Sequence, residues 1–247
     1  MEKISVTIIA LNEEKNIGEC LESVKWADEI LVSDSGSTDK TVEICGRYGA
    51  KVFNDAWRGF GAQKNLLGDR AVNGWILNVD ADERVTPALK EELLKAVEGG
   101  GKAGYYVPRK NFFGRKWIRH CGWYPDYNLR LYRKERGRFT ERAVHESVKV
   151  DGATGRLKTP LEHFTYRDVS DYLTRMERYS TLAADEMSGR GRRAGALDLL
   201  FRPAFTFFKM FVLKRGFLHG ADGVMLSMLY ASYTLAKYAK LREKRGP

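Results

Sequence analysis

The sequence has few of the features that mark secreted or zinc-binding proteins. Only three of its 247 residues are cysteines, and these lie far apart without a C-x-x-C spacing. Neither a disulfide framework nor a zinc site is therefore expected. The short apolar run at the N-terminus meets Glu13 and Glu14 at once, which makes it too brief for a signal peptide. We expect a protein of the reducing cytoplasm.

Long hydrophobic runs, internal repeats and low-complexity linkers are also missing. The longest apolar stretch near the end, residues 217–236, is interrupted by His219, Gly220, Asp222 and Gly223. A membrane-spanning helix needs about 20 predominantly apolar residues in succession, so no such helix is predicted. With 43% apolar and 12% aromatic residues, the chain can still bury a full core as one α/β domain with a small appendage.

The net charge of +10 is distributed unevenly. The segment from Gly189 to the end has twelve basic and three acidic residues, so the first 188 residues are close to neutral. We expect residues 189–247 to form a helical, basic and amphipathic extension that meets an anionic membrane surface or a second subunit. Nucleic-acid binding is an alternative reading of this charge, but the sequence has no recognised nucleic-acid motif. We therefore expect no nucleic-acid partner.

Apolar patterns in the first 90 residues predict strands that alternate with helices. The four expected strands cover residues 4–9, 29–33, 51–53 and 75–79. This order implies an α/β fold with a Rossmann-like, mostly parallel sheet flanked by helices. Ligands bind such sheets beyond the C-terminal ends of the strands.

Spacing and capping residues predict the helices. The first has Ile17, Cys20, Leu21 and Val24 at helical intervals after Asn12, a candidate N-cap. Residues 37–39 can cap a second helix in which Val42 and Cys45 face inward. Further helical stretches are expected at residues 63–67, from Pro87, and from about Asp168. Two strand-like runs, 105–109 and 128–132, lie between the last two.

Polar clusters follow the first, second and fourth predicted strands: Leu11-Asn-Glu13, Asp34-Ser-Gly-Ser-Thr-Asp39 and Asp80-Ala-Asp-Glu83. Asp80 and Asp82 are too close in sequence for an acid/base pair with separate roles. They suit a hard divalent cation that keeps positions open for phosphate oxygens. A turn before Pro87 would also explain them, but their place beside two other clusters favours the metal site. Asp34 can accept hydrogen bonds from a nucleotide.

Four motifs, in this order and spacing, resemble glycosyltransferase family 2: Ile9-Ala-Leu-Asn-Glu13, Val32-Ser-Asp-Ser-Gly-Ser-Thr-Asp39, Gln63-Lys-Asn65 and Asn78-Val-Asp-Ala-Asp-Glu83. More narrowly, they resemble the branch that adds glucose or similar sugars to the inner core of lipopolysaccharide. The resemblance implies a GT-A fold and an inverting hexosyltransferase that uses Mg²⁺ or Mn²⁺.

The resemblance also implies roles for residues of these motifs. Ala10, Asn12 and Glu13 would line the nucleotide, and Asp34 would meet the base. The family usually has two acidic residues where this chain has Asp34-Ser35, so the exact base contact stays open.

The same resemblance places Lys64 near the nucleotide. Asp82 would be the main metal ligand, and Asp80 would lie near the ribose and the metal.

Three residues outside these motifs complete the expected site. Glu146 lies where the lipopolysaccharide branch has a similar His-Glu, and is the candidate base that deprotonates the acceptor; a surface carboxylate is the alternative. Strand alternation would put Arg130 on one face with Asn128 and Tyr132, and Leu129 with Leu131 on the other. Arg130 could neutralise the leaving diphosphate, or be an ordinary exposed arginine. His163 is a candidate metal or phosphate contact, although a lone histidine more often makes a structural hydrogen bond.

Residues 1–188 are expected to form the catalytic domain, with the donor half at about 1–100 and the acceptor half at about 101–188. The expected reaction moves a hexose from a nucleotide sugar, UDP-glucose being the first choice, to a lipid-linked saccharide such as the lipopolysaccharide core. The enzyme would be peripheral on the inner face of the cell membrane. A polyprenyl phosphate acceptor, which needs no base, is the alternative. The absence of a Gln-x-x-Arg-Trp motif predicts the addition of single sugars.

Overall fold

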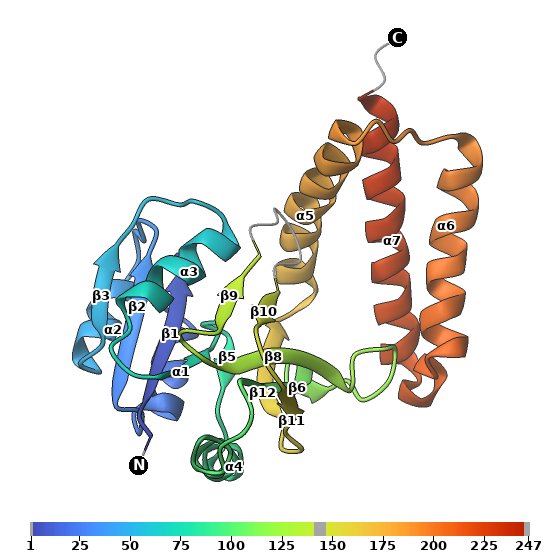
Figure 1. The fold of residues 1–247 in the computed structure, drawn as a ribbon. Coiled ribbons are helices and arrows are strands. Elements are labelled where there is room, and N and C mark those ends of the chain that lie inside the picture. Colours follow the sequence, from blue (N-terminus) through green and yellow to red (C-terminus); the bar gives the residue numbers. More distant parts are fainter. Residues whose placement is uncertain (1, 141–146, 245–247) are drawn as a thin grey trace. The chain divides into compact units, whose positions relative to one another are not determined.

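The structure, a computed structural model, describes residues 2–140 and 147–244 (Figure 1). The chain forms two compact units. The first comprises Met1–Lys110 and Asp126–His163, and the second comprises Asn111–Pro125 and Phe164–Pro247. The expected division at residue 189 stays a prediction.

A mixed sheet forms the first unit. Four of its strands are parallel and lie side by side in the order β3 (Lys51–Asn54), β2 (Glu29–Asp34), β1 (Ile4–Ala10) and β4 (Trp75–Asn78). The sheet continues beyond β4 through β8 (Asp126–Arg133), β6 (Gly104–Phe113), β12 (Leu161–Tyr166) and β5 (Glu83–Arg84). The predicted α/β, GT-A-like fold is thus confirmed, and the strands added after β4 include antiparallel pairs.

Short strands extend this arrangement. β11 (Thr154–Arg156) and β7 (Lys116–Trp117) pair with β6, and β9 (Gly137–Phe139) pairs with β10 (Val148–Val150) in a separate two-stranded sheet. The β9 strand ends just before residues 141–146, which lie outside the described part of the chain.

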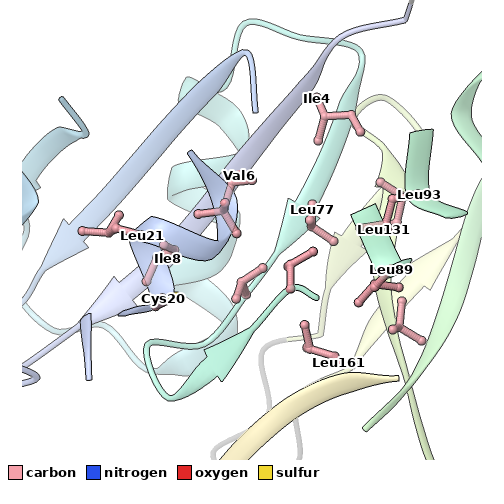
Figure 2. Close-up of a cluster of buried hydrophobic side chains, with 14 of the residues drawn as sticks. Ile4, Val6, Ile8, Cys20, Leu21, Leu77, Leu89, Leu93, Leu131 and Leu161 are labelled. Atoms are coloured by element: carbon pink, nitrogen blue, oxygen red, sulfur yellow. The ribbon is translucent and has the colours of Figure 1, made fainter. Parts of the chain in front are cut away.

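Helices cover both faces of the parallel strands. They are α1 (Ile17–Val24), α2 (Thr41–Arg47), α3 (Phe60–Arg70) and α4 (Pro87–Glu98). Because side chains alternate along a strand, Leu31 and Ile76 pack with Leu67 of α3, whereas Val32 and Leu77 pack in a second cluster with residues of α1 and α4 (Figure 2). The sequence pattern of buried strands is explained by this two-sided core.

Two predicted details of the helices are wrong. Asn12 does not cap α1, because Asn16 lies at the N-cap position and the Asn12 amide oxygen instead accepts a hydrogen bond from the Thr38 N–H at 2.8 Å. Val42 does not face inward but is 43% exposed, since the buried positions of α2 are Thr41 and Cys45, one helical turn apart.

The second unit is mainly helical. Its helices are α5 (Val169–Gly189), α6 (Ala196–Phe208), the π-helical turn η1 (Lys209–Leu213), the 3₁₀ turn η2 (Gly216–His219) and α7 (Ala221–Glu243). Asp168 caps α5 through the Asp171 N–H at 2.8 Å, which confirms the predicted helix start. Both α5 and α6 pack against α7 (Figure 1). Within residues 2–140 and 147–244, no helix has the length and apolar character needed to cross a membrane.

Candidate donor site

The polar clusters after β1 and β2 are joined by hydrogen bonds. The register pairs Ala10 with Asp34, so the two strands end side by side. Beyond these ends, the Asn12 N–H donates to the Ser37 hydroxyl at 2.8 Å, and the Glu13 N–H donates to the Thr41 hydroxyl at 2.8 Å. The two predicted clusters therefore form one rim of the sheet, as the parallel topology requires.

Asp34 organises the loop that follows it. Its buried carboxylate accepts hydrogen bonds from the backbone N–H groups of Gly36 at 2.9 Å and Ser37 at 2.8 Å, and from the Ser37 hydroxyl. Gly36 has a φ of +96°, a conformation that favours glycine. Asp34 thus shapes this part of the rim, and its contact with a nucleotide base stays a prediction.

Asp80, just after β4, lies between two cations. One carboxylate oxygen is 2.9 Å from Lys64 Nζ, and the other is 2.7 Å from Arg130 Nη2. Burial acts to raise the pKa of Asp80, but the charges of Arg130 and Lys64 outweigh this effect and hold the pKa well below its usual range. Asp80 is therefore ionised near neutral pH, and it orients both cations.

A β-bulge directs Arg130 toward Asp80. The register pairs Tyr105 with Leu131 and Tyr106 with Leu129, so Arg130 is an extra residue in β8. Bulges commonly re-aim a side chain next to an active site. The predicted alternation is wrong for this reason: Leu131 packs on one face of the sheet, and Leu129 packs on the other.

The bulge also buries Arg130, which is only 5% exposed, so it is not an ordinary surface arginine. Its guanidinium donates to Asn78 Oδ1 at 3.1 Å and to Glu83. Glu83 is fully buried and accepts a further hydrogen bond from the Asp80 N–H at 2.9 Å. Arg130 and the two carboxylates thus form one ionic network, in which Arg130 and Glu83 are buried and Asp80 is partly exposed.

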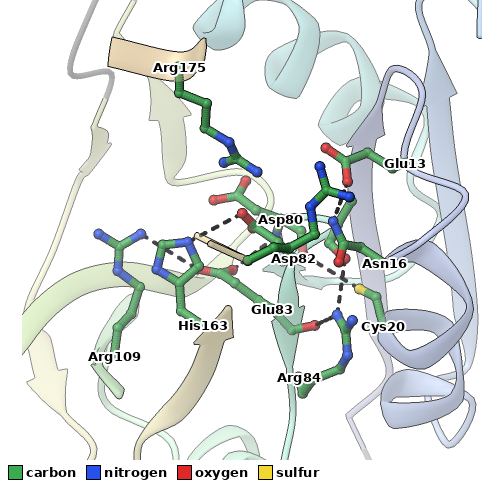
Figure 3. Close-up of polar contacts among 12 residues, drawn as sticks. Glu13, Asn16, Cys20, Asp80, Asp82, Glu83, Arg84, Arg109, His163 and Arg175 are labelled. Carbon is green, nitrogen blue, oxygen red and sulfur yellow. Dashed lines mark hydrogen bonds and ion pairs between the residues drawn. The ribbon is translucent and has the colours of Figure 1, made fainter. Parts of the chain in front are cut away.

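Asp82 and His163 lie beside Asp80 and Glu83 (Figure 3). His163 is paired with Glu83 in the β12–β5 register, and its Nε2 is 3.5 Å from Asp82 Oδ2. Over the described ranges, no group of three or more histidine, cysteine, aspartate or glutamate side chains is arranged so that it could bind a metal ion. One carboxylate and one imidazole still suit a cation that arrives with phosphate oxygens and water as its other ligands.

Comparisons with known proteins identify the family. Residues 5–164 match the model of the family described as "Glycosyl transferase family 2". The chain belongs to this family. It is a glycosyltransferase, as the motifs and the fold had indicated.

Two relatives resemble this glycosyltransferase over nearly its whole length. The lipopolysaccharide core biosynthesis glycosyltransferase LpsC of Rhizobium meliloti is 31% identical, with 98% of this chain and 93% of that protein covered. An uncharacterized glycosyltransferase of Rickettsia bellii is 33% identical, with 98% and 87% covered. The crystal structure of residues 1–349 of S. aureus TarS is 15% identical, with a TM-score of 0.51 over 98% of this chain and 90% of that one, which shows a shared fold.

Two residues of the glycosyltransferase site were missed in the sequence. Glu83 was seen only as part of a polar cluster, although its position three residues after Asp80 places it in the same turn. Arg109 of β6 lies 3.6 Å from Glu83 Oε1 and donates through Nε to Asp126 at 2.9 Å. The sequence gives no signal for Arg109, because its contacts depend on the pairing of β6 with β8, which are separate segments of the chain.

The predicted general base, Glu146, lies outside the described residues, and its role stays a prediction. The strand that leads toward it is fixed by α3. Asn65 donates to the Phe139 carbonyl at 3.0 Å and accepts from the Phe139 N–H at 2.8 Å, while the neighbouring Lys64 reaches Asp80. Helix α3 thus positions both Lys64 and the end of β9.

We expect Asn65→Leu to lower the free energy of unfolding by about 1–3 kcal/mol, because the buried backbone groups of Phe139 would lose their partners. Urea denaturation measures this change. Asn54→Leu, at an exposed position at the end of β3, is the control and should leave stability nearly unchanged. Equal effects of both substitutions would show that the Asn65 hydrogen bonds contribute nothing specific.

Proposed function

We propose that this glycosyltransferase moves a hexose, with inversion, from a nucleotide sugar to a saccharide hydroxyl of a lipid-linked acceptor such as the lipopolysaccharide core. UDP-glucose is the preferred donor, and Mg²⁺ or Mn²⁺ the cofactor. The observation that carries the proposal is the close grouping of Asp80 with Lys64 and Arg130, next to Asp82 and His163, at the C-terminal edge of the parallel strands.

Each part of this group suits one requirement of sugar transfer. The leaving nucleoside diphosphate gains negative charge as the bond to the sugar breaks, and Lys64 and Arg130 would neutralise it. Asp80 holds both cations in place at 2.9 and 2.7 Å. Asp82 and His163 would hold the metal, which when bound supplies further positive charge at the diphosphate. The rim formed by Asn12, Glu13 and Asp34 would bind the nucleoside, as the family resemblance implies.

The acceptor side depends on a base. Glu146 would take the proton from the acceptor hydroxyl while its oxygen attacks the anomeric carbon opposite the diphosphate, which gives inversion. The similarity to LpsC, which is named for lipopolysaccharide core biosynthesis, supports a saccharide acceptor. A lipid-linked acceptor would make the protein peripheral on the inner face of the cell membrane.

A donor screen tests the proposal. The protein is incubated with a panel of nucleotide sugars and Mg²⁺ or Mn²⁺, and release of the nucleotide is followed with and without a lipopolysaccharide-core acceptor. We expect release with UDP-glucose, stimulation by the acceptor, and loss of activity when a chelator removes the metal. If no nucleotide sugar is bound or cleaved, or if the chelator has no effect, the proposal is wrong.

Glu146→Gln separates the two acceptor classes. A saccharide hydroxyl needs a base, so transfer to the core acceptor should fall by roughly a hundredfold. A polyprenyl phosphate is already nucleophilic and would tolerate the substitution. The measurement is the transfer rate with each acceptor, and binding of the donor serves as the control because Glu146 is not expected to contact it.

A further inference from the structure

A stripe of apolar side chains in the second unit is exposed to solvent. On the α6, η1 and η2 segments, the apolar residues that are more than half exposed are Leu197, Leu200, Phe201, Phe205, Leu213 and Leu218. Those of α6 recur at helical intervals, so they lie along one face of the helix. Surface helices normally turn polar residues to solvent, and α6 does the reverse.

The inner face of α6 already has a partner. Leu199 packs against the buried cluster that contains Tyr238 and Leu241, and the hydroxyls of Thr206 and Thr234 lie 3.2 Å apart. The exposed stripe is therefore not the side of the helix that packs within this unit. Burying it would require something outside the unit.

The chain segment that carries the stripe is basic. Between residues 190 and 220 the chain has seven basic residues and one acidic residue, Asp198, which pairs with Arg202 at 2.5 Å. Arg192 and Arg193 precede α6, and Lys214 and Arg215 follow η1; all four are exposed. Cations thus flank both ends of an apolar surface, which is the composition of helices that lie at a membrane interface.

A groove between α6 and α7 continues the apolar surface. Its volume is about 720 Å³, and its lining includes Phe201, Phe205 and Phe208 from one helix and Lys237 and Tyr238 from the other. Aromatic side chains suit acyl chains, and an ammonium group suits a headgroup phosphate. An anionic phospholipid matches both.

We infer that the apolar face of α6, η1 and η2 docks on an anionic phospholipid membrane. A second copy of the chain fits less well. In a two-fold dimer this face would meet itself, so the cations at its ends would approach one another without carboxylates to pair with. Anionic headgroups supply the missing negative charge. The inference goes beyond sugar transfer, because none of these residues belongs to the donor site.

Co-sedimentation of the whole protein with lipid vesicles tests the inference. We expect binding to vesicles of phosphatidylcholine with phosphatidylglycerol to be at least roughly tenfold tighter than to phosphatidylcholine alone, and to weaken as salt is raised. Phe201→Ser combined with Phe205→Ser should weaken binding by about tenfold or more, because apolar area no longer enters the membrane. Lys214→Gln combined with Arg215→Gln should weaken binding to the anionic vesicles only, by about tenfold.

The matched control is Leu173→Ser combined with Leu182→Ser, two exposed apolar positions of α5 at 44% and 39% exposure. It should bind vesicles as the unchanged protein does. Donor cleavage without vesicles, which does not depend on docking, shows that each variant is folded. Equal binding to both kinds of vesicle, or equal weakening by the control, would overturn the inference. So would a dimer, seen by light scattering, that the Phe201/Phe205 variant dissociates.

Discussion

Asp82→Ala is expected to reduce the rate of sugar transfer by roughly 10²–10³-fold. Asp82 and His163 lie next to Asp80, with His163 Nε2 3.5 Å from Asp82 Oδ2, so a carboxylate and an imidazole are close enough to share one metal at the diphosphate. Without the carboxylate, the leaving group would lose most of the charge that the cation supplies. The loss should appear in kcat as well as in kcat/KM, because the charge at the diphosphate develops in the transition state.

Two comparisons distinguish loss of the metal from general damage. Asp151→Asn removes a carboxylate at an exposed position and should leave activity unchanged. Titration calorimetry with Mn²⁺ in the presence of UDP should show weaker metal binding for Asp82→Ala and normal binding for the control. If Asp82→Ala lost activity while Mn²⁺ bound as before, Asp82 would not be the metal ligand.

Much of the fold follows from the sequence because it depends on short-range patterns. The spacing of Ile17, Cys20, Leu21 and Val24 identified the buried face of α1 correctly, and the apolar runs located β1 to β4 within about one residue at each end. The errors arose where a longer-range contact took precedence. Asparagine is a common N-cap residue, but the side-chain oxygen of Asn12 accepts a hydrogen bond from the N–H of Thr38, 26 positions later in the chain.

The candidate site could be predicted only in part for the same reason. Parallel topology is enough to bring Asn12, Asp34 and Asp80 to one rim. It cannot show that Arg130 occupies a bulge, because a bulge is a property of two paired strands rather than of either one. Arg109 was missed since its partners, Glu83 and Asp126, come from other segments of the chain.

Arg130→Met is expected to lower the free energy of unfolding by about 3–5 kcal/mol, because it leaves the buried carboxylate of Glu83 without its main cation. Glu83 is fully buried and the Asp80 side chain is 29% exposed, and both contact the Arg130 guanidinium. Urea denaturation at pH 7 gives the measurement. Arg138→Met, which breaks an exposed pair with Asp69, is the control and should cost less than about 1 kcal/mol.

The buried network also predicts how the Arg130 effect changes with pH and with a second substitution. The pKa of Asp80 is lowered in the folded protein, so its contribution to stability is present above its usual value of 3.8 and is lost as the pH falls through the folded value. Of the two cations beside Asp80, Arg130 lowers the pKa of this carboxyl more than Lys64 does. The Arg130→Met variant should therefore lose less stability than the unchanged protein when the pH falls below about 4.

The second substitution is Glu83→Leu, which removes the buried carboxylate that Arg130→Met leaves without its main cation. The double variant should therefore be more stable than Arg130→Met alone. Its loss should fall short of the sum of the two single losses by a coupling energy of about 0.5–3 kcal/mol. Additive losses in the double variant would contradict the network and show that Arg130 stabilises β8 by packing alone. Sugar transfer should stay slow in both variants, because neither restores a cation where the diphosphate leaves. Recovery of stability without recovery of transfer would separate the structural role of Arg130 from its role in the reaction.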